Sequence, residues 1–393
     1  MISLARYAEL LRQPALRSLI TASVIGRLPI GLTGLAVLLL AQGASGSFAQ
    51  GGTAAACYVA GLAAIAPLLG RKIDRYGPRP ILLICALAFP SALVALVAAV
   101  HFGVSWLGLA CAVIAGTSFP PITVCMRTFF RQQLQAEAQL AAAYSLESVL
   151  IETIFIVGPL LVALFVALAS PAAAVLFAAV CGLAGTLLFR RSAALRRWRI
   201  EEKHSTSLFG PLAEPGFVPL LLVVLGYASA FGLIEIGTAA YAMELGRPAL
   251  AGVLLGLMSV GSVAGGLVYG SRSWHLPLAR QFSLILIVMG LGVAPLALLS
   301  AAWAFTLWCV VAGVVMAPAL ITQSMLVAKI ASPGHSTEAF TWSASSLLAG
   351  VGLGLAGGGW LLEHGRAANV LAAAAATSVA AGLLALRLVK SRN

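Results

Sequence analysis

The chain has 393 residues, of which 61% are hydrophobic and only 9% are charged. A soluble protein of this length needs far more charge to cover its surface, so the composition excludes an ordinary soluble enzyme. A formal net charge of +12 would indicate a nucleic-acid partner if the protein were soluble. Here the positions of the basic residues along the chain decide what that excess means.

Twelve apolar stretches approach the roughly 20 residues that a helix needs to cross a bilayer. We expect the first six at 18–40, 53–69, 80–100, 105–126, 143–168 and 172–189. The second six are expected at 217–242, 249–269, 281–300, 303–326, 340–362 and 369–388. The first stretch is too long for a signal-peptide core, and no clear cleavage site follows it, so we interpret it as a span.

The order of these stretches predicts an all-α membrane protein with two six-helix halves. The halves are residues 1–189 and 217–393, and residues 190–216 form a polar linker between them. Two short segments recur about 200 residues later, which favours a duplicated unit with pseudo-twofold symmetry. Pro67–Arg71 is similar to Leu267–Arg272, and Ala143–Leu146 is similar to Ala339–Trp342.

The Lys and Arg residues fall almost entirely on one side of the predicted spans. Of the 24, only Arg247 and Arg366 lie on the other side, and Arg27 lies within a span. By the positive-inside rule, we expect a multi-pass protein of a bacterial-type inner membrane with both termini in the cytoplasm. This distribution explains the basic excess without a nucleic-acid partner. The basic first half of the linker, with Trp198, is either a solvated connector or a segment lying on anionic lipid.

The segment Gly70–Arg79 reads Gly-Arg-Lys-Ile-Asp-Arg-Tyr-Gly-Pro-Arg and lies between the second and third spans. Gly70 and Gly77 permit a tight reversal and a close approach of helices. The carboxylate of Asp74 has basic neighbours to pair with, and a helix N-terminus would also favour it. Read alone, the segment could also be a basic loop with one incidental Asp.

This segment resembles the signature loop of the major facilitator superfamily, a family of secondary transporters. Gly70, Asp74, Arg75, Gly77 and Arg79 match the signature, whereas Pro80 replaces its last basic residue. The resemblance implies that the segment holds the two halves together at the cytoplasmic side in the outward-facing state. In the second half, only Gly270–Arg272 remains of the corresponding loop.

Four ionisable residues within predicted spans are candidate proton or substrate sites, because charge at membrane depth is costly. Arg27 and Glu147 have similar expected depths, and they form either a structural ion pair or part of the site. Glu152 and Glu235 are the stronger candidates for proton transfer, with Glu235 first, because burial would favour their protonated forms. All five histidines are assigned to loops, which argues against a histidine relay within the membrane.

Two further motifs resemble known functional signatures but are explained as well or better by helix structure. Gly352–Gly357 has the spacing of a dinucleotide-binding loop but lies within a predicted span, so Gly350, Gly354 and Gly358 are better explained by helix packing. Gly158-Pro159 matches only the centre of the family's antiporter signature, and an ordinary proline kink would also explain the pair. Six cysteines without a Cys-x-x-Cys pair indicate neither a disulfide framework nor a zinc site.

Together these features predict a secondary active transporter that exports a small organic or amphipathic solute in exchange for protons. We expect a monomer in the lipid bilayer that has no cofactor and uses the proton gradient as its energy source. An importer of a small metabolite and a non-transporting sensor remain as alternatives. An integral membrane enzyme is disfavoured, because no cluster of nucleophile, base and metal ligands occurs at membrane depth.

Overall fold

The computed structural model describes residues 14–45, 48–134, 136–200, 210–247, 250–363 and 365–390. Arg6, Arg12, Lys203, His204, His364 and Arg392 lie outside these ranges. Within them the protein is all-helical, and twelve segments are long and apolar enough to cross a membrane. The predicted fold class is therefore confirmed.

The first half contains six spans built from seven α-helices. They are α2 (Pro14–Ser45), α3 (Phe48–Tyr76), α4 (Pro78–His101), α5 (Ser105–Thr117) with α6 (Ile122–Gln133), α7 (Glu137–Leu168) and α8 (Pro171–Arg191). The span predicted at 105–126 is interrupted between α5 and α6. Pro120 and Pro121 account for the break, because proline lacks a backbone N–H and disfavours helical geometry at the residue before it.

The second half repeats this arrangement. Its helices are α9 (Phe217–Glu244), α10 (Leu250–Ser271), α11 (Leu278–Val293), α12 (Ala302–Gly313) with α13 (Met316–Ile330), α14 (Ser336–Glu363) and α15 (Ala367–Lys390). Short 3-10 turns cover Ala194–Arg197, Gly210–Ala213, Ala294–Ala297 and Pro333–His335. The span predicted at 303–326 is therefore divided into α12 and α13, as the equivalent span of the first half is.

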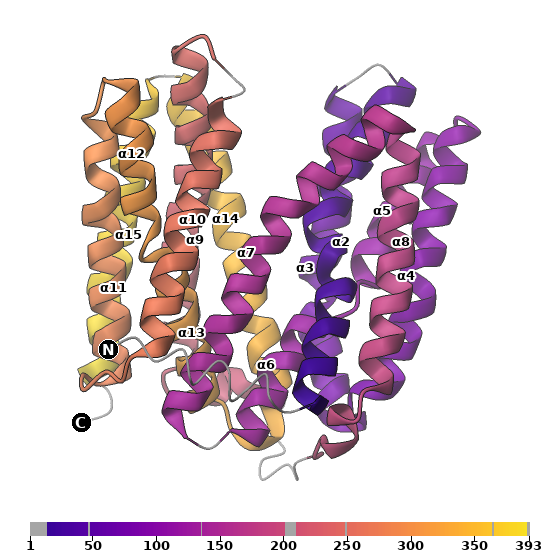
Figure 1. Cartoon of the computed structure of the whole chain (residues 1–393), viewed down its shortest axis with the longest axis horizontal. Coiled ribbons are helices and arrows are strands. Elements are labelled where there is room, and N and C mark those ends of the chain that lie inside the picture. Colours follow the sequence, from indigo (N-terminus) through magenta and orange to yellow (C-terminus); the bar gives the residue numbers. More distant parts are fainter. Residues whose placement is uncertain are drawn as a thin grey trace.

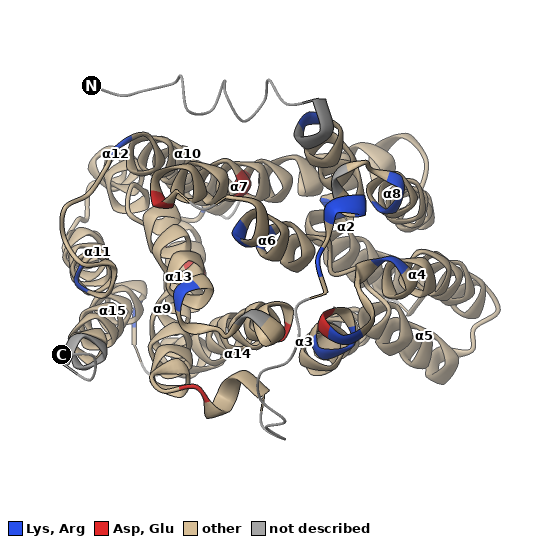
Figure 2. Ribbon diagram, turned by 90° about the horizontal axis from the view of Figure 1, so that it is seen from below, with Lys and Arg blue, Asp and Glu red and all other residues tan. Residues whose placement is uncertain are grey.

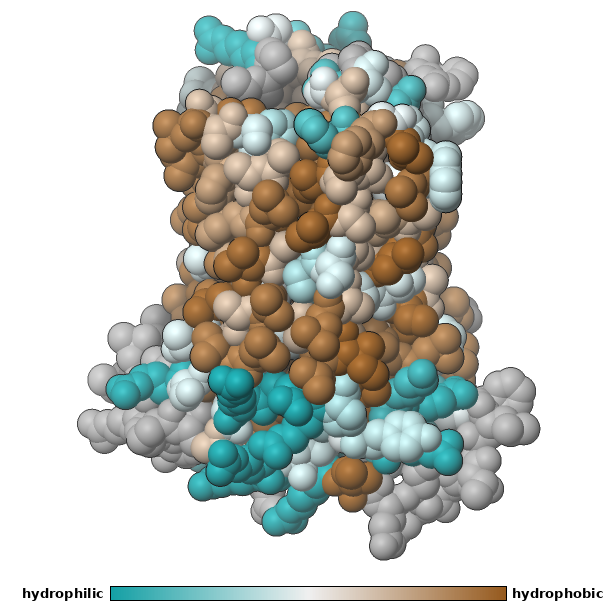
Figure 3. Space-filling model, turned by 90° about the vertical axis from the view of Figure 1, so that its right-hand side faces the viewer, coloured by the Kyte–Doolittle hydropathy of each residue, from teal (hydrophilic) through white to brown (hydrophobic). Residues whose placement is uncertain are grey.

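The two halves stand side by side, the first in indigo to magenta and the second in orange to yellow (Figure 1). Hydrophilic side chains gather at the lower end of the bundle, below a belt of hydrophobic side chains (Figure 3), and Lys and Arg are among them (Figure 2). We call this the basic end. The halves meet there, where α3 packs against α14 and α7 packs against α10 and α13, and they diverge toward the opposite end.

The hydrophobic core follows the same division. One cluster of buried side chains joins both halves, and it includes Ile73, Phe130 and Phe340. Two further clusters each belong to a single half, one around Leu93 and the other around Leu371. The core is thus continuous across the halves in one region and separate elsewhere, which is the packing of a bundle closed at one end.

Candidate functional site

The segment Gly70–Arg79 is mostly helix. The reversal predicted for Gly70 and Gly77 does not include Gly70, because α3 continues through Gly70 to Tyr76. The reversal occurs at Gly77, whose φ of 77° is in the left-handed region that favours glycine. Pro78 then begins α4, where its missing N–H costs nothing. As a result, Asp74 lies in the last turn of α3 and not in a solvated loop.

Asp74 connects the two halves through the N-terminus of α14. Its Oδ1 accepts a hydrogen bond from the backbone N–H of Thr337 at 2.9 Å, and its Oδ2 accepts one from Glu338 at 2.8 Å. These N–H groups have no partner within their own helix, and the helix dipole favours a negative charge beside them. The sequence suggested either a basic neighbour or a helix N-terminus as the partner of Asp74. In the structure its partner is the N-terminus of α14.

Two neighbours of Asp74 on α3 extend this contact. Arg71 donates to the carboxylate of Glu338 through Nε at 3.1 Å and Nη2 at 2.7 Å. A Cβ atom at Gly70 would lie 2.5 Å from the Thr341 hydroxyl oxygen and 2.8 Å from the Glu338 Cα. A larger residue at position 70 would therefore push α3 away from α14.

A fourth residue of this contact, Arg131 of α6, was not singled out from the sequence. Its Nε donates to the carbonyl of Ala328 and its Nη2 to that of Ala331, both at 2.7 Å. Its Nη1 also contacts the Ser336 hydroxyl. The two carbonyls lie at the C-terminus of α13, where a cation is favoured.

The halves are thus joined by Asp74 at the N-terminus of α14 and by Arg131 at the C-terminus of α13. We call Gly70, Arg71, Asp74 and Arg131, with their partners in the second half, the gate cluster. The only sequence signal for Arg131 is its position four residues after Arg127 near a predicted span end.

The ion pair suggested between Arg27 and Glu147 is present and has a third member. Arg27 Nη1 lies 3.4 Å from Glu147 Oε1, and Arg127 Nε of α6 lies 3.2 Å from Glu147 Oε2. The side chains of Arg27 and Glu147 are 0% and 1% exposed. These residues join α2, α6 and α7 of the first half, so the triad connects helices within one half and does not cross between halves.

Glu152 and Glu235 have different surroundings. Glu152 of α7 accepts a hydrogen bond from the Ser262 hydroxyl of α10 at 2.9 Å, so it reaches the second half. Glu235 of α9 lies within a span, and its side chain is exposed at the surface of the protein. It makes no hydrogen bond or ion pair with the described residues. The structure does not bring these two carboxyl groups together with the Arg27–Glu147 pair.

The profile of the Major Facilitator Superfamily matches residues 19–340, which is most of the chain. The chain belongs to this superfamily. A search of curated proteins finds no match.

Solved structures of three other transporters are similar to this major facilitator protein over nearly its whole length. The human organic anion transporter MFSD10 is 18% identical with a TM-score of 0.74, covering 95% of this chain and 99% of its own. A bacterial homologue of the iron transporter ferroportin, in its outward-facing state, is 14% identical with a TM-score of 0.78 and the same two coverages. A variant of the E. coli fucose:proton symporter FucP is 12% identical with a TM-score of 0.71, covering 95% and 98%. At these identities the similarity shows the fold alone.

The remaining signature residues of this major facilitator protein do not cross between the halves. Arg75 is exposed, and its guanidinium lies 5.3 Å from the ring centre of Tyr76. Arg79 is exposed, and its carbonyl accepts a hydrogen bond from Arg190 of the same half. Gly77 supplies the turn. Of the five signature residues, Gly70 and Asp74 therefore make the contact between the halves.

The glycines assigned to helix packing lie at close helix contacts. Gly350, Gly354 and Gly358 of α14 all face α9. A Cβ atom at Gly158 of α7 would lie 2.6 Å from the carbonyl carbon of Gly31 in α2. Gly158 therefore has a packing role within the first half.

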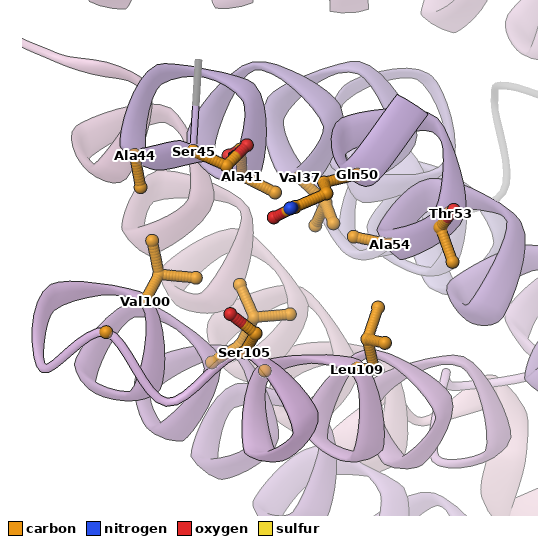
Figure 4. A pocket seen from close by; sticks show the side chains of 13 residues that line it. Val37, Ala41, Ala44, Ser45, Gln50, Thr53, Ala54, Val100, Ser105 and Leu109 are labelled. Atoms are coloured by element: carbon orange, nitrogen blue, oxygen red, sulfur yellow. The ribbon is translucent and has the colours of Figure 1, made fainter. Parts of the chain in front are cut away.

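A pocket of about 430 Å³ lies away from all of these residues. It opens between the ends of α2 and α3 and those of α4 and α5, within the first half (Figure 4). Val37, Leu96 and Leu109 form apolar walls, and Gln50 and Ser105 are among its few polar side chains. A site within one half does not change sides when the halves move, so this pocket is a poor place for a transported solute.

Proposed function

We propose that this protein is a secondary active transporter that works by alternating access in the inner membrane. It would export a small organic or amphipathic solute in exchange for protons, as a monomer with no cofactor. The observation that carries the proposal is the gate cluster, because its contacts join the two halves at one end of the bundle only. Breaking these contacts would allow the halves to separate there and close at the other end.

The orientation in the membrane rests on the basic end. The positive-inside rule places this end, and with it both termini, in the cytoplasm. The structure would then be the outward-facing state, with the cytoplasmic side closed by α3, α6, α13 and α14. Solute would bind between the halves near the middle of the membrane, where substrate sites of such duplicated transporters lie.

Proton coupling is assigned to Glu235 and Glu152. Glu235 is an exposed carboxyl in the middle of α9 with no basic partner among the described residues. Glu152 lies on the contact between α7 and α10, where loss or gain of a proton changes its bond to Ser262. A carboxyl at a contact between the halves can link protonation to their movement.

The test is solute flux in proteoliposomes with an imposed pH gradient. Wild-type protein should move solute only while the gradient lasts, and Glu235→Gln protein that inserts normally should lose the proton-driven part. Full proton-driven transport by the Gln variant would contradict the assignment to Glu235. Movement of solute in the same direction as the protons would show import by symport, which is the alternative. Absence of flux for every solute would favour a sensor.

A further inference from the structure

The buried triad of Arg27, Glu147 and Arg127 carries more positive than negative charge. Both guanidinium groups bind the same carboxylate, one at each oxygen. Arginine stays protonated in proteins, so the triad has a net charge of about +1 with Glu147 ionised and about +2 with it neutral. No protonation state of Glu147 balances two arginines.

Three other acidic groups on or near these helices are bound elsewhere, and Glu137 at the start of α7 is exposed. Asp74 accepts from the N-terminus of α14, and Glu338 pairs with Arg71. Glu152 is five residues from Glu147, about 140° around α7, and bonds to α10. An uncompensated charge away from water is costly, so the excess positive charge favours an anion beside the triad.

Arg127 has N–H groups available to bind an anion, whereas Arg27 does not. Arg27 is fully buried and uses Nε and Nη2 on the carbonyl and hydroxyl of Ser23 at 3.2 and 2.9 Å. Arg127 uses Nε on Glu147, and its side chain is 13% exposed. Its Nη1 and Nη2 make no hydrogen bond within the part of the chain that the structure describes. Two such nitrogens match the two oxygens of a carboxylate.

Arg127 also lies beside the contact between the halves. It is one helical turn from Arg131, which crosses to α13, and both therefore share one face of α6. Seen from the basic end, α6 lies at the centre of the bundle, between α7, α13 and α14 (Figure 2).

We propose that the transported solute is an organic anion whose acidic group binds the Nη atoms of Arg127. This rests on the proposed function, because it assigns the substrate class of the same transporter. Glu147 holds Arg127 in place through Nε, and the excess charge of the triad selects an anion over a neutral or cationic solute. An inorganic counter-ion fixed at the triad is the competing occupant.

Binding to purified protein tests the charge selectivity. The probes are acids paired with their amides, such as benzoate with benzamide and octanoate with octanamide, and sodium chloride as the inorganic anion. At least one acid should raise the unfolding temperature at concentrations where its amide and chloride do not. Amides that bind as well as their acids, or chloride that gives the whole effect, would overturn the proposal.

Variants separate binding from structure. Arg127→Gln leaves the Arg27–Glu147 pair intact and removes the excess charge, so it should fold, and it should bind the acid about tenfold more weakly or worse. Arg127→Lys should recover part of the affinity, and Lys72→Gln, which removes an exposed charge, should change nothing. Unchanged acid binding by Arg127→Gln contradicts the proposal and leaves Arg127 a structural role.

Flux distinguishes this proposal from the proposed function. If acids bind through Arg127 but none is moved in proteoliposomes under any gradient, the proposed function fails and the anion site stands. If gradient-driven flux is found only for neutral or cationic solutes, the proposed function stands and the anion site fails.

Discussion

Replacing Asp74 with Asn should open the basic end of the bundle. The carboxylate accepts two N–H bonds of 2.9 and 2.8 Å from the first turn of α14. The Asn side chain keeps one acceptor oxygen, places an NH₂ group against the other N–H, and removes the charge at the helix N-terminus. Capping and charge–dipole effects of this kind are worth about 1–2 kcal/mol, so the ratio of closed to open protein should fall by about 5- to 30-fold.

Spin labels can measure this change directly. Lys72 of α3 and Lys329 of α13 are exposed at the basic end and belong to different halves. In a background without the native cysteines, double electron–electron resonance between labels at these positions should show a new, longer distance in Asp74→Asn protein.

The matched control is Glu244→Gln, because the Glu244 carboxylate also accepts from a helix N-terminus, the N–H of Ala367 at 2.8 Å. That contact joins α9 and α15 within one half, so its loss should leave the distance between the labels unchanged. If Asp74→Asn shifts no population, or Glu244→Gln shifts as much, charge capping of α14 does not hold the halves together.

Three further substitutions probe other parts of the structure. Arg131→Gln removes the bonds to the carbonyls of Ala328 and Ala331, and should lengthen the same spin-label distance, whereas exposed Arg75→Gln should not. Glu152→Gln should abolish proton-driven flux. Ser262→Ala removes the hydrogen bond but keeps the carboxyl group, so this variant should retain proton-driven flux. Equal loss of flux in both variants would assign Glu152 a structural role. Gly158→Val forces α7 against Gly31 and should lower stability by about 1–3 kcal/mol, seen as a lower unfolding temperature, whereas Gly34→Val has open space and should cost little.

Most of the fold could be predicted because lipid imposes simple rules on a sequence. The length of apolar runs indicates the spans, whereas the direction expected from the asymmetry of Lys and Arg stays a prediction. Helix ends and breaks were less predictable. Residues 70–76 continue α3 beyond the apolar run, and two of the polar residues among them, Arg71 and Asp74, have their partners on α14.

The candidate site could be predicted only in part, because it depends on contacts between distant segments. Depth along the spans suggested that Arg27 and Glu147 pair, but no local pattern indicated that Arg127 shares the same carboxylate. Arg131 binds backbone carbonyls, which carry no sequence signature. Glu235 lies within a span, as its apolar neighbours predicted, but no local pattern indicated that its side chain would be exposed on α9.

The central claim, that opening and closing of the basic end moves solute, is tested most directly by locking that end. The Ser345 hydroxyl of α14 donates to the Ala63 carbonyl of α3 at 3.1 Å, deeper in the membrane than the gate cluster. A short thiol cross-linker between cysteines at these two positions would keep α3 and α14 from separating at the basic end. The account predicts that a reducible cross-link stops gradient-driven flux in proteoliposomes and that reduction restores it, with each single-cysteine variant unaffected. Undiminished flux through fully cross-linked protein would contradict it.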